Sequence, residues 1–331
     1  MRAAVYTGAG GIEMIAIRDD VPEPIVGSED ALVEVAYGGL NRADVLERMG
    51  RYPVPKRDIA IPGIEFSGTV RAVGPQVTNV APGDRVCALV QSGAHAQRLA
   101  TNALTLSKVP DGVDLRTAAA IPEAFITAHD ALFDRGRFAL GETALVHAVG
   151  SGVGLAAVEL IKRAGGIAIG TSRTTWKLER ARDYGLDFGF ALDGDWPRRL
   201  LEATGSRGAD VILDFVGAPI LEENFKALAP RGRIVQIGTL GGIDAKMNLG
   251  VMMAKRAELH GTVLRSRALD EKIALARQFS ALLLPFFARG ELRATIDRTF
   301  PLAQLGAAHE YMESNGNFGK ILIEIAGDDS R

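Results

Sequence analysis

Cysteine is almost absent from this sequence, since Cys87 is the only one among 331 residues. A disulfide within the chain needs two cysteines and a cysteine-rich zinc lobe needs more, so the sequence excludes both. An excess of charge of one sign is also lacking, because 38 lysines and arginines stand against 40 aspartates and glutamates. This balance, together with an aromatic content of only 6%, argues against a dedicated binder of nucleic acids or anionic membranes.

Long hydrophobic runs are missing as well. No stretch approaches the roughly 20 apolar residues that a membrane-spanning helix needs, and the first residues, MRAAVYT, lack the apolar core of a signal peptide. Hydrophobic residues at 47% and charged residues at 24% are close to globular averages. We therefore expect a soluble cytoplasmic protein, and the length predicts two domains.

The first part of the chain, up to about residue 120, has the pattern of a β domain. Short β-branched runs at 31–37 and 68–73 are separated by glycine and proline pairs such as Pro62-Gly63. Closely spaced short strands with such turns predict a barrel-like or sandwich unit, interrupted by one helix at 42–49.

From about residue 120 onward, apolar strands alternate with helical segments, which predicts a doubly wound parallel sheet. The expected strands are 143–149, 167–171, 211–215 and 234–238, and the expected helices are 155–163, 174–183 and 220–229. A further helix at 269–287, a strand at 295–298, a helix at 302–313 and a strand at 320–325 follow.

A glycine-rich loop, Ala148 to Gly154, lies between an expected strand and an expected helix. Small residues at such a place let the backbone approach a pyrophosphate, and the helix N-terminus offers free N–H groups. The G-x-G-x-x-G pattern is not met, because Leu155 stands at its third position, and the string fits a looser A-x-x-S-x-x-G version. A tight strand–helix turn without a ligand is the alternative interpretation.

The end of the next expected strand lacks the acidic residue that usually holds the ribose 2′-hydroxyl of NAD. Thr171 is followed there by Ser172 and Arg173, and Lys177 lies on the expected helix. Charge-assisted hydrogen bonds of about 1.5–3 kcal/mol from such groups favour a 2′-phosphate, and hence NADPH. Alternatively, Arg173 and Lys177 are solvated charges at the start of a helix.

Several strings together resemble one family. They are GLNRADVLERMGRYPVP (39–55), PGIEFSGTVRAVG (62–74), GDRV (83–86), AAAIPEAFITAHDAL (118–132), VHAVGSGVG (146–154), LRSR (264–267) and YMESNGNFGKILIE (311–324). Over nearly its whole length the chain resembles the zinc-free quinone oxidoreductase branch of the medium-chain dehydrogenase/reductase superfamily, and within it the p53-induced quinone oxidoreductase-like group. The resemblance implies an α/β fold with a GroES-like, mostly-β substrate domain at 1–122, a doubly wound Rossmann domain at 123–265 and a C-terminal return at 266–331.

The resemblance also implies a metal-independent enzyme. Zinc-dependent relatives carry a Cys where Asn41 stands, a His at Ile64 and a Cys near Glu123, and none of these ligands is present. The five histidines are scattered, with no i,i+4 pair to build a zinc site. His147, in an apolar strand, is expected to be a hydrogen-bonded core residue.

By the same resemblance, the cofactor is NADPH and its contacts fall along the whole chain. The implied contacts are Ser151, Gly152, Val153 and Gly154 at the pyrophosphate, Thr171, Ser172 and Lys177 at the 2′-phosphate end, Gly238 and Leu264 near the nicotinamide, and Asn41, Tyr52, Thr127 and Asn317 across the cleft. Leu192 stands where relatives often have a tyrosine beside the adenosine phosphate.

The implied reaction is hydride transfer from NADPH to a quinone or a related activated carbonyl compound. A quinone is already an electron sink, so it needs a hydrogen-bond donor and a proton rather than a metal. Tyr52 and the Asn41 amide are the expected donors, while Arg42 and Asp44 organise the loop; alternatively, Tyr52 only packs beside Pro53. Two other functions stay open: an enone or 2-enoyl thioester reductase, and a non-catalytic NADPH-binding protein with a structural or RNA-associated role.

The expected partners are a small-molecule acceptor and a second copy of the chain, with no membrane and no nucleic acid. The apolar stretch 238–253 is expected to end the parallel sheet and to pair edge to edge with another copy. The family resemblance likewise implies a homodimer.

Overall fold

The computed structural model describes residues 1–55 and 57–326, which form two compact units. Unit 1 combines Met1–Ile126 with Leu264–Arg331, and unit 2 is Thr127–Val263. The chain therefore leaves unit 1 once and returns to it, at junctions after residues 126 and 263. The sequence predicts these junctions after residues 122 and 265.

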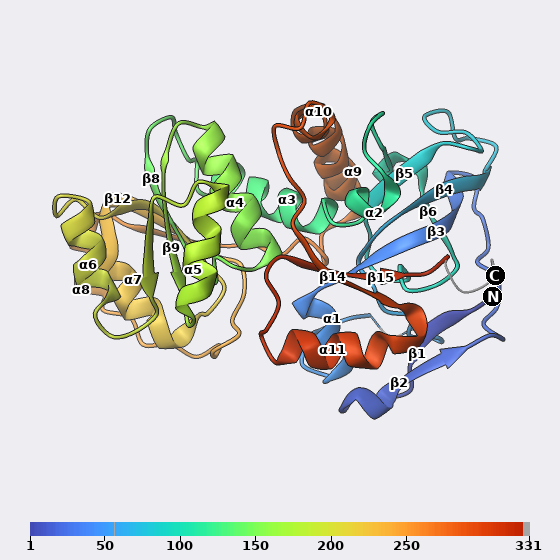
Figure 1. Cartoon of the computed structure of the whole chain (residues 1–331), viewed down its shortest axis with the longest axis horizontal. Helices are drawn as coiled ribbons and strands as arrows, with labels where there is room; N and C mark the ends of the chain where they lie inside the picture. The colour runs from blue at the N-terminus through green and yellow to red at the C-terminus, as the bar shows by residue number, and fades with distance from the viewer. Residues whose placement is uncertain (56, 327–331) are drawn as a thin grey trace. The chain divides into compact units, whose positions relative to one another are not determined.

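Unit 1 is built on a seven-stranded sheet in the order β14-β15-β3-β4-β5-β7, with β6 paired to β3 (Figure 1). The strands are β3 (Asp30–Leu40), β4 (Glu65–Val73), β5 (Arg85–Leu89), β6 (Arg98–Asn102), β7 (Ser107–Lys108), β14 (Ile296–Pro301) and β15 (Lys320–Glu324). A separate antiparallel pair joins β1 (Ala3–Tyr6) to β2 (Ile15–Arg18). The C-terminal strand β15 runs antiparallel to β3, with Ile321 opposite Leu40, so the last segment completes the sheet begun by the first.

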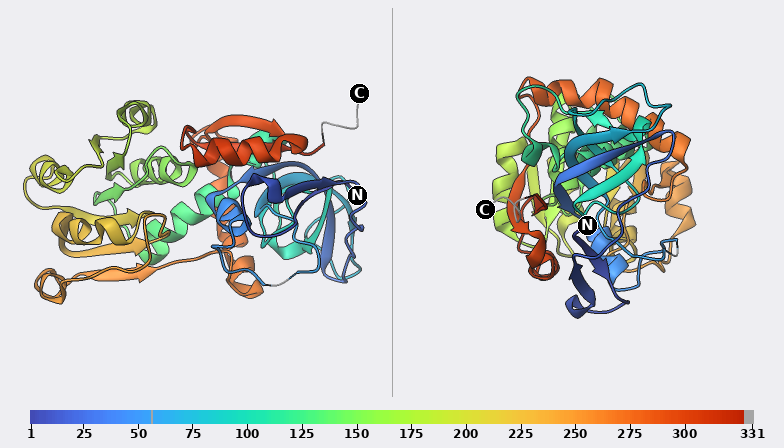
Figure 2. Two further views of the ribbon diagram at one scale, coloured as in Figure 1. Left: turned by 90° about the horizontal axis from the view of Figure 1, so that it is seen from below. Right: turned by 90° about the vertical axis from the view of Figure 1, so that its right-hand side faces the viewer.

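The core of unit 1 follows from side-chain alternation along β3. Ala31, Val33 and Val35 are buried and alternate with more exposed neighbours, as expected for a strand with one face on the core. They pack with Phe66 of β4 and Ile321 of β15 in one hydrophobic cluster. Figure 2 shows the strands of this unit from two further directions.

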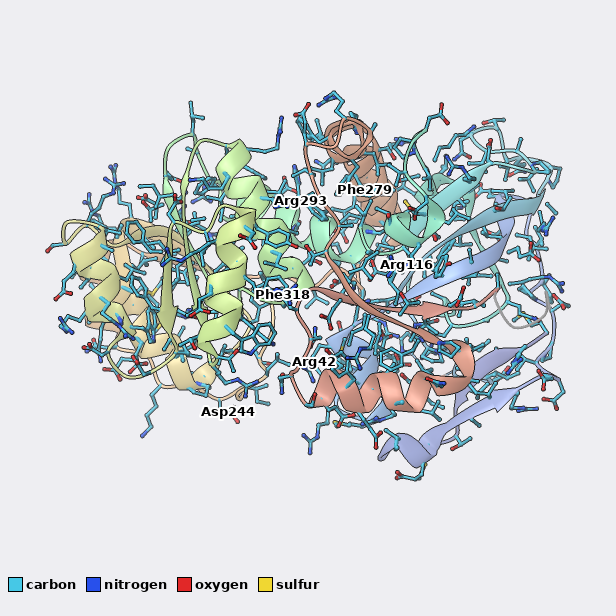
Figure 3. All side chains as sticks on the ribbon, in the orientation of Figure 1. Arg42, Arg116, Asp244, Phe279, Arg293 and Phe318 are labelled. Carbon is cyan, nitrogen blue, oxygen red and sulfur yellow. The ribbon has the colours of Figure 1, made fainter. Side chains whose placement is uncertain are left out.

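The helices of unit 1 are α1 (Arg42–Arg48), α2 (Leu115–Ala118), α3 (Pro122–His129), which contains the first junction, α9 (Leu269–Gln278), α10 (Leu284–Ala288) and α11 (Leu305–Glu313). The predicted single helix at 269–287 is interrupted by a π-helical segment at Phe279–Leu283, just before Pro285 at the start of α10. A proline removes a helical hydrogen bond, so a change of helix type at this place has a local cause. Figure 3 shows Arg42 beside α11, where its Nη2 donates to the Met312 carbonyl at 2.8 Å.

Unit 2 contains a six-stranded parallel sheet in the order β10-β9-β8-β11-β12-β13. Its strands are β8 (Thr143–Val146), β9 (Ile167–Ser172), β10 (Phe188–Ala191), β11 (Ala209–Asp214), β12 (Leu228–Gln236) and β13 (Glu258–Gly261). Its helices are α4 (Gly152–Arg163), α5 (Thr175–Ala181), α6 (Trp196–Ala203), α7 (Leu221–Ala227) and α8 (Leu249–Lys255), and Figure 1 shows α4 and α5 in front of β8 and β9. Chain order runs one way from β8 and the other way from β11, which is the 3-2-1-4-5-6 order of dinucleotide-binding sheets.

One expectation about this sheet is wrong: residues 238–253 do not form its edge. The edge strand is β13, while 238–253 contains a glycine turn and the beginning of α8. Gly217 and Gly242 form an isolated bridge, and the φ of Gly242 is +148°, a conformation that favours glycine. The side chain of Asn248 then caps α8 by accepting from the Val251 N–H.

The predicted fold class, a mostly-β unit plus a doubly wound parallel sheet, is confirmed. Helix α4 begins three residues earlier than the apolar periodicity suggests, because Ser151 caps it. Across the described parts of the chain, no helix combines the length and the apolar character needed to cross a membrane.

Candidate active site

The loop after β8 lies where the strand order of unit 2 reverses, which is where open α/β sheets bind their ligands. Ala148 has a left-handed φ of +49°, which turns the chain sharply out of the strand. The Ser151 hydroxyl oxygen then accepts a hydrogen bond from the Gly154 N–H at 3.0 Å and caps α4. The N–H groups of Gly152 and Val153 have no carbonyl within the helix to bond, so this helix end can receive an anion.

Two glycines make the loop tight. A Cβ on Gly154 would lie 2.7 Å from the Val149 carbonyl oxygen, and a Cβ on Gly150 would lie 2.8 Å from the Cδ of Lys177. The aliphatic part of Lys177 therefore crosses directly over Gly150. The structure thus brings together the phosphate loop and Lys177, two predicted features that are separated in the sequence. A small-residue cradle beside a basic side chain fits a dinucleotide with a further phosphate.

The end of β9 lies beside this loop, because the Thr171 carbonyl accepts from the Val149 N–H at 3.1 Å. Ser172 is the last residue of the strand, and its Oγ accepts from the Thr174 N–H at 3.2 Å. Thr171 is buried and its hydroxyl oxygen lies 2.6 Å from the His147 Nδ1, so its side chain is directed into the core. Arg173 is exposed.

His147 is a hydrogen-bonded core residue, as the sequence predicts. Its Nε2 lies 2.7 Å from the Asn224 Oδ1, and the Asn224 amide in turn donates to Asp214 at 2.8 Å. The Asp214 carboxylate also accepts from the N–H groups of Val216 and Gly217. Burial lowers the pKa of His147, which keeps the ring neutral within the network.

The other predicted cofactor residues divide between the two units. In unit 2, Thr127 is buried, and Gly238 follows β12, where its N–H donates to the Asp214 carbonyl at 3.2 Å. In unit 1, Leu264 is buried, and the Asn317 amide donates to the Gly319 carbonyl at 2.9 Å. Leu192, in unit 2, packs against a hydrophobic cluster of that unit.

In unit 1, Asn41 belongs to a buried group that we call the Glu65 cluster: Asn41, Glu65 and Lys320. The Asn41 amide nitrogen donates to Glu65 at 3.0 Å, and its oxygen accepts from the Lys320 ammonium at 2.5 Å. Lys320 also forms an ion pair with Glu65, whose second oxygen accepts from the Glu123 N–H at 2.8 Å. Asn41 is therefore held by protein groups on both ends of its amide.

The predicted zinc-replacement positions lie at this cluster. Asn41 and the Glu123 N–H both contact Glu65, and Ile64 is buried next to it in sequence. The Lys320 ammonium group balances the charge of Glu65. Within residues 1–55 and 57–326, no three His, Cys, Asp or Glu side chains are grouped so that they could hold a metal.

A second group, the Glu47 cluster, consists of the buried Glu47 and Arg265 and the partly buried Arg57. One Glu47 oxygen pairs with Arg57 and the other pairs with Arg265, so two guanidinium groups share one carboxylate. The Arg265 guanidinium carbon lies 5.3 Å from the centre of the Tyr52 ring. Burial raises the pKa of the Tyr52 phenol, against the opposing effect of the Arg265 charge, so the hydroxyl is protonated at neutral pH and can donate.

Asp44 connects the two clusters through α1. One of its oxygens accepts from the Asn41 N–H at 2.8 Å as part of the capping box of the helix. The other oxygen accepts from the Gly63 N–H at 3.1 Å. Burial raises the pKa of Asp44 to about 7, although the Arg265 charge and these hydrogen bonds act in the other direction. The sequence predicts that Asp44 organises the loop, and in the structure its carboxylate accepts hydrogen bonds from the backbone of two separate segments.

Four site residues were not identified from the sequence: Glu47, Arg57, Arg265 and Lys320. Arg265 and Lys320 lie in the strings LRSR and NFGKILIE, and Glu47 lies on the predicted helix at 42–49. Arg265 and Lys320 act through partners more than 200 residues away in the chain, as for Glu47 and Arg265 with a separation of 218. Local patterns carry no information on such pairs.

Comparison with known proteins defines the class of protein. The alcohol dehydrogenase GroES-like domain matches residues 27–127, and the zinc-binding dehydrogenase family matches residues 152–281. The quinone oxidoreductase of Pseudomonas aeruginosa is 32% identical, over 96% of this chain and 98% of the relative. The chain belongs to the quinone oxidoreductase branch of the medium-chain dehydrogenase/reductase superfamily, as its sequence motifs indicate.

Two solved structures extend this comparison. The Escherichia coli quinone oxidoreductase complexed with NADPH is similar with a TM-score of 0.89 and 26% identity, covering 98% of this chain and all of that one (100%). The CurK enoyl reductase is similar with a TM-score of 0.87 and 25% identity, covering 98% of each chain.

Asp44 generates a prediction about pH and stability. Its folded-state pKa of about 7 lies above the unfolded value of about 3.9, so the folded protein binds the proton more tightly. This group therefore makes the free energy of unfolding fall as the pH rises from about 4 to about 7, by at most about 1.4 kcal/mol per pH unit. Asp44→Asn removes the titration. The free energy of unfolding of the wild type minus that of the variant, measured by urea unfolding across this pH range, should fall as the pH rises. Parallel curves of free energy against pH for the two proteins would contradict the prediction.

Proposed function

We propose that the protein is an NADPH-dependent, metal-independent reductase of quinones or related activated carbonyl compounds. The observation that carries the proposal is the cradle at the switch point of unit 2, where Lys177 crosses Gly150 beside the N-terminus of α4. Similarity to proteins named quinone oxidoreductase, one of them complexed with NADPH, supports the same function.

The phosphate loop and the end of β9 would hold the cofactor. The N–H groups at Gly152 and Val153 would receive the pyrophosphate, and Ser151 and Gly154 shape that helix end. Ser172 and Lys177 would receive the 2′-phosphate, and no acidic side chain directly follows Ser172 in the sequence to oppose it. Thr171 would contribute through its backbone, and Thr127, Gly238, Leu264 and Asn317 are further proposed contacts. When bound, the reduced nicotinamide supplies a hydride.

In unit 1, we assign different tasks to the two proposed catalytic residues. Tyr52 keeps its proton at neutral pH, so its hydroxyl can donate to an acceptor oxygen while its ring covers a flat conjugated molecule. Asn41 is held between Glu65 and Lys320, so we assign it to shaping and polarising the wall of the acceptor site. Reduction of the acceptor also requires a proton at its oxygen, and we assign the Tyr52 hydroxyl to orienting that oxygen rather than to being the obligatory source of the proton.

A second candidate function is the reduction of enones or 2-enoyl thioesters. The similarity to the CurK enoyl reductase over 98% of each chain favours it as an alternative, because the same fold supports both reactions. Both reactions deliver a hydride to a conjugated electrophile and differ in which carbon receives it. A non-catalytic role in NADPH binding is a further outcome of the test described below.

We also propose that the protein forms a homodimer through unit 2. Among the described residues, β13 is the last strand of its sheet and pairs only with β12, and Ile243, Leu249 and Met253 are exposed in the segment that precedes it. Apolar side chains near a free sheet edge favour pairing with an identical edge. Sedimentation at the mass of one 35.2 kDa chain would refute this assembly.

The proposed function predicts NADPH oxidation by quinones that does not depend on a metal. Purified protein would be assayed with a panel of quinones, enones and 2-enoyl thioesters, with and without EDTA, and its zinc content would be measured. We expect the highest kcat/KM with quinones and no loss of activity with EDTA. Faster turnover of enoyl thioesters would favour the second candidate, and NADPH binding without any turnover would favour the non-catalytic role. Stoichiometric zinc together with inactivation by EDTA would contradict metal independence.

The cofactor assignment predicts that Lys177→Ala weakens NADPH binding about 10- to 100-fold, the equivalent of one lost charge-assisted interaction. NADH has no 2′-phosphate, so its affinity should hardly change. Arg180→Ala is a matched control, because Arg180 lies on the same helix and also packs over Trp176. Calorimetric titration of both cofactors measures the ratio. Equal losses for the two cofactors would remove Lys177 from the 2′-phosphate site.

The acceptor assignment predicts different effects for two Tyr52 variants. Tyr52→Phe keeps the ring and should retain most of kcat, because a quinone carries its own electron sink. Tyr52→Ala removes the ring as well and should raise the KM for the acceptor. If the hydroxyl polarises the acceptor in the transition state, the Phe variant already loses kcat. Wild-type kinetics in both variants, with unchanged NADPH affinity, would place Tyr52 outside the site.

A further inference from the structure

A small pocket in unit 1 lies against the Glu47 cluster. It has a volume of about 80 Å³ and is lined by Val54, Pro55, Arg57, Gln91, Ser92 and Arg265, which we call the Arg265 pocket. A single water needs about 10–15 Å³ on this measure, so the pocket has room for a group of several heavy atoms. Two of its lining residues carry guanidinium groups.

Arg265 lines this pocket and has one buried donor without a partner among the described residues. Its side chain is only 6% exposed, its Nε donates to the Gln91 carbonyl at 2.8 Å and its Nη2 pairs with Glu47. Its Nη1 is buried and has no hydrogen-bond partner in the described residues. Leaving a buried charged donor unsatisfied is costly, so such a nitrogen indicates a place where a ligand supplies the acceptor.

The charges around the pocket also favour an anion. Arg57 and Arg265 share the single carboxylate of Glu47, which leaves one positive charge in the Glu47 cluster without a counter-charge. A third cation lies within electrostatic reach, since burial and the Arg265 charge both lower the pKa of Lys272. Asp44 compensates only in part, because its pKa of about 7 leaves it partly protonated at neutral pH.

We infer that the Arg265 pocket binds a carboxylate-type anionic substituent of the acceptor, so that the enzyme selects acidic quinones over neutral ones. The selection among quinones rests on the proposed function. The binding of an anion rests on the pocket alone. An arginine guanidinium group presents N–H groups that match the oxygens of a carboxylate. In Arg265, Nη1 is the guanidinium nitrogen that has no hydrogen-bond partner in the described residues. The nearby Tyr52 ring suits an aromatic acceptor whose acidic arm reaches the pocket.

The first experiment measures anion binding without turnover. Benzoate and its neutral analogue benzamide would be titrated into the protein by calorimetry in low-chloride buffer. We expect benzoate to bind at least about tenfold more tightly than benzamide, and Arg265→Gln to remove that difference. Glu47 remains paired with Arg57 in this variant. Arg265→Lys, which keeps the charge and loses the fork, provides a second test if the glutamine variant does not fold.

Arg18→Gln is the matched control. Arg18 also lies in unit 1 and is exposed, where it pairs with Asp20, so the variant has the same charge change at the surface. It should bind benzoate as the wild type does. Failure of benzoate to bind, or equal binding by wild type and Arg265→Gln, would overturn the inference.

The second experiment measures selection during turnover. A naphthoquinone with a propionate side chain and its methyl ester differ in charge but hardly in the reactivity of the ring. We expect kcat/KM to favour the acid about 10- to 100-fold in the wild type and to become nearly equal in Arg265→Gln. Equal use of acid and ester by the wild type would overturn the inference. Arg265-dependent benzoate binding without turnover of any quinone would support the anion pocket and refute the quinone reductase function.

Discussion

Unit 1 depends on one buried charge, the carboxylate of Glu65. It lies on β4 and is reached by the N-cap residue of α1, by the N-terminus of α3 and by Lys320 of β15. A carboxylate without partners in the interior would cost several kcal/mol, and removing one partner of such a pair typically costs about 3–5 kcal/mol. Since Lys320 comes from the end of the chain, the charge of Glu65 is balanced only when the C-terminal segment has returned to unit 1. The same contacts hold Asn41. The residues that close the sheet of unit 1 therefore also form the wall of the proposed acceptor site.

Unit 2 obtains its site by a different physical route. The phosphate loop, residues 148–154, contains no charged side chain, and its shape depends on the small size of its residues. The contacts that a Cβ would make at Gly150 and Gly154 show that the loop, the start of α4 and the stem of Lys177 are already at close packing. Behind them, the His147 network satisfies the buried polar groups at the ends of three neighbouring strands. A rigid, fully hydrogen-bonded support keeps the loop in one conformation for a ligand.

The Glu47 cluster contrasts with both of these arrangements, because its charges do not cancel. Glu65 is matched by Lys320, whereas Glu47 faces two arginines. Buried sites with unbalanced charge and unsatisfied donors are unfavourable in the free protein and are relieved when a ligand of opposite charge binds. This imbalance distinguishes the Arg265 pocket from an ordinary structural ion pair and points to selection among acceptors.

The sequence by itself determined the features that depend on local pattern. The alternation of short strands and turns identified unit 1, and the β–α alternation identified the parallel sheet of unit 2. The residues at 148–154 and 170–173 predicted where the proposed cofactor site lies and that it lacks an acidic residue. Only the tertiary structure decided that Lys320 neutralises Glu65, that Arg265 and Arg57 share Glu47, that the Thr171 hydroxyl turns toward His147, and that β13 rather than 238–253 ends the sheet. Periodicity and turn chemistry act over a few residues. An ion pair or a strand neighbour depends instead on which distant segments the topology brings together, and no local pattern predicts that proximity.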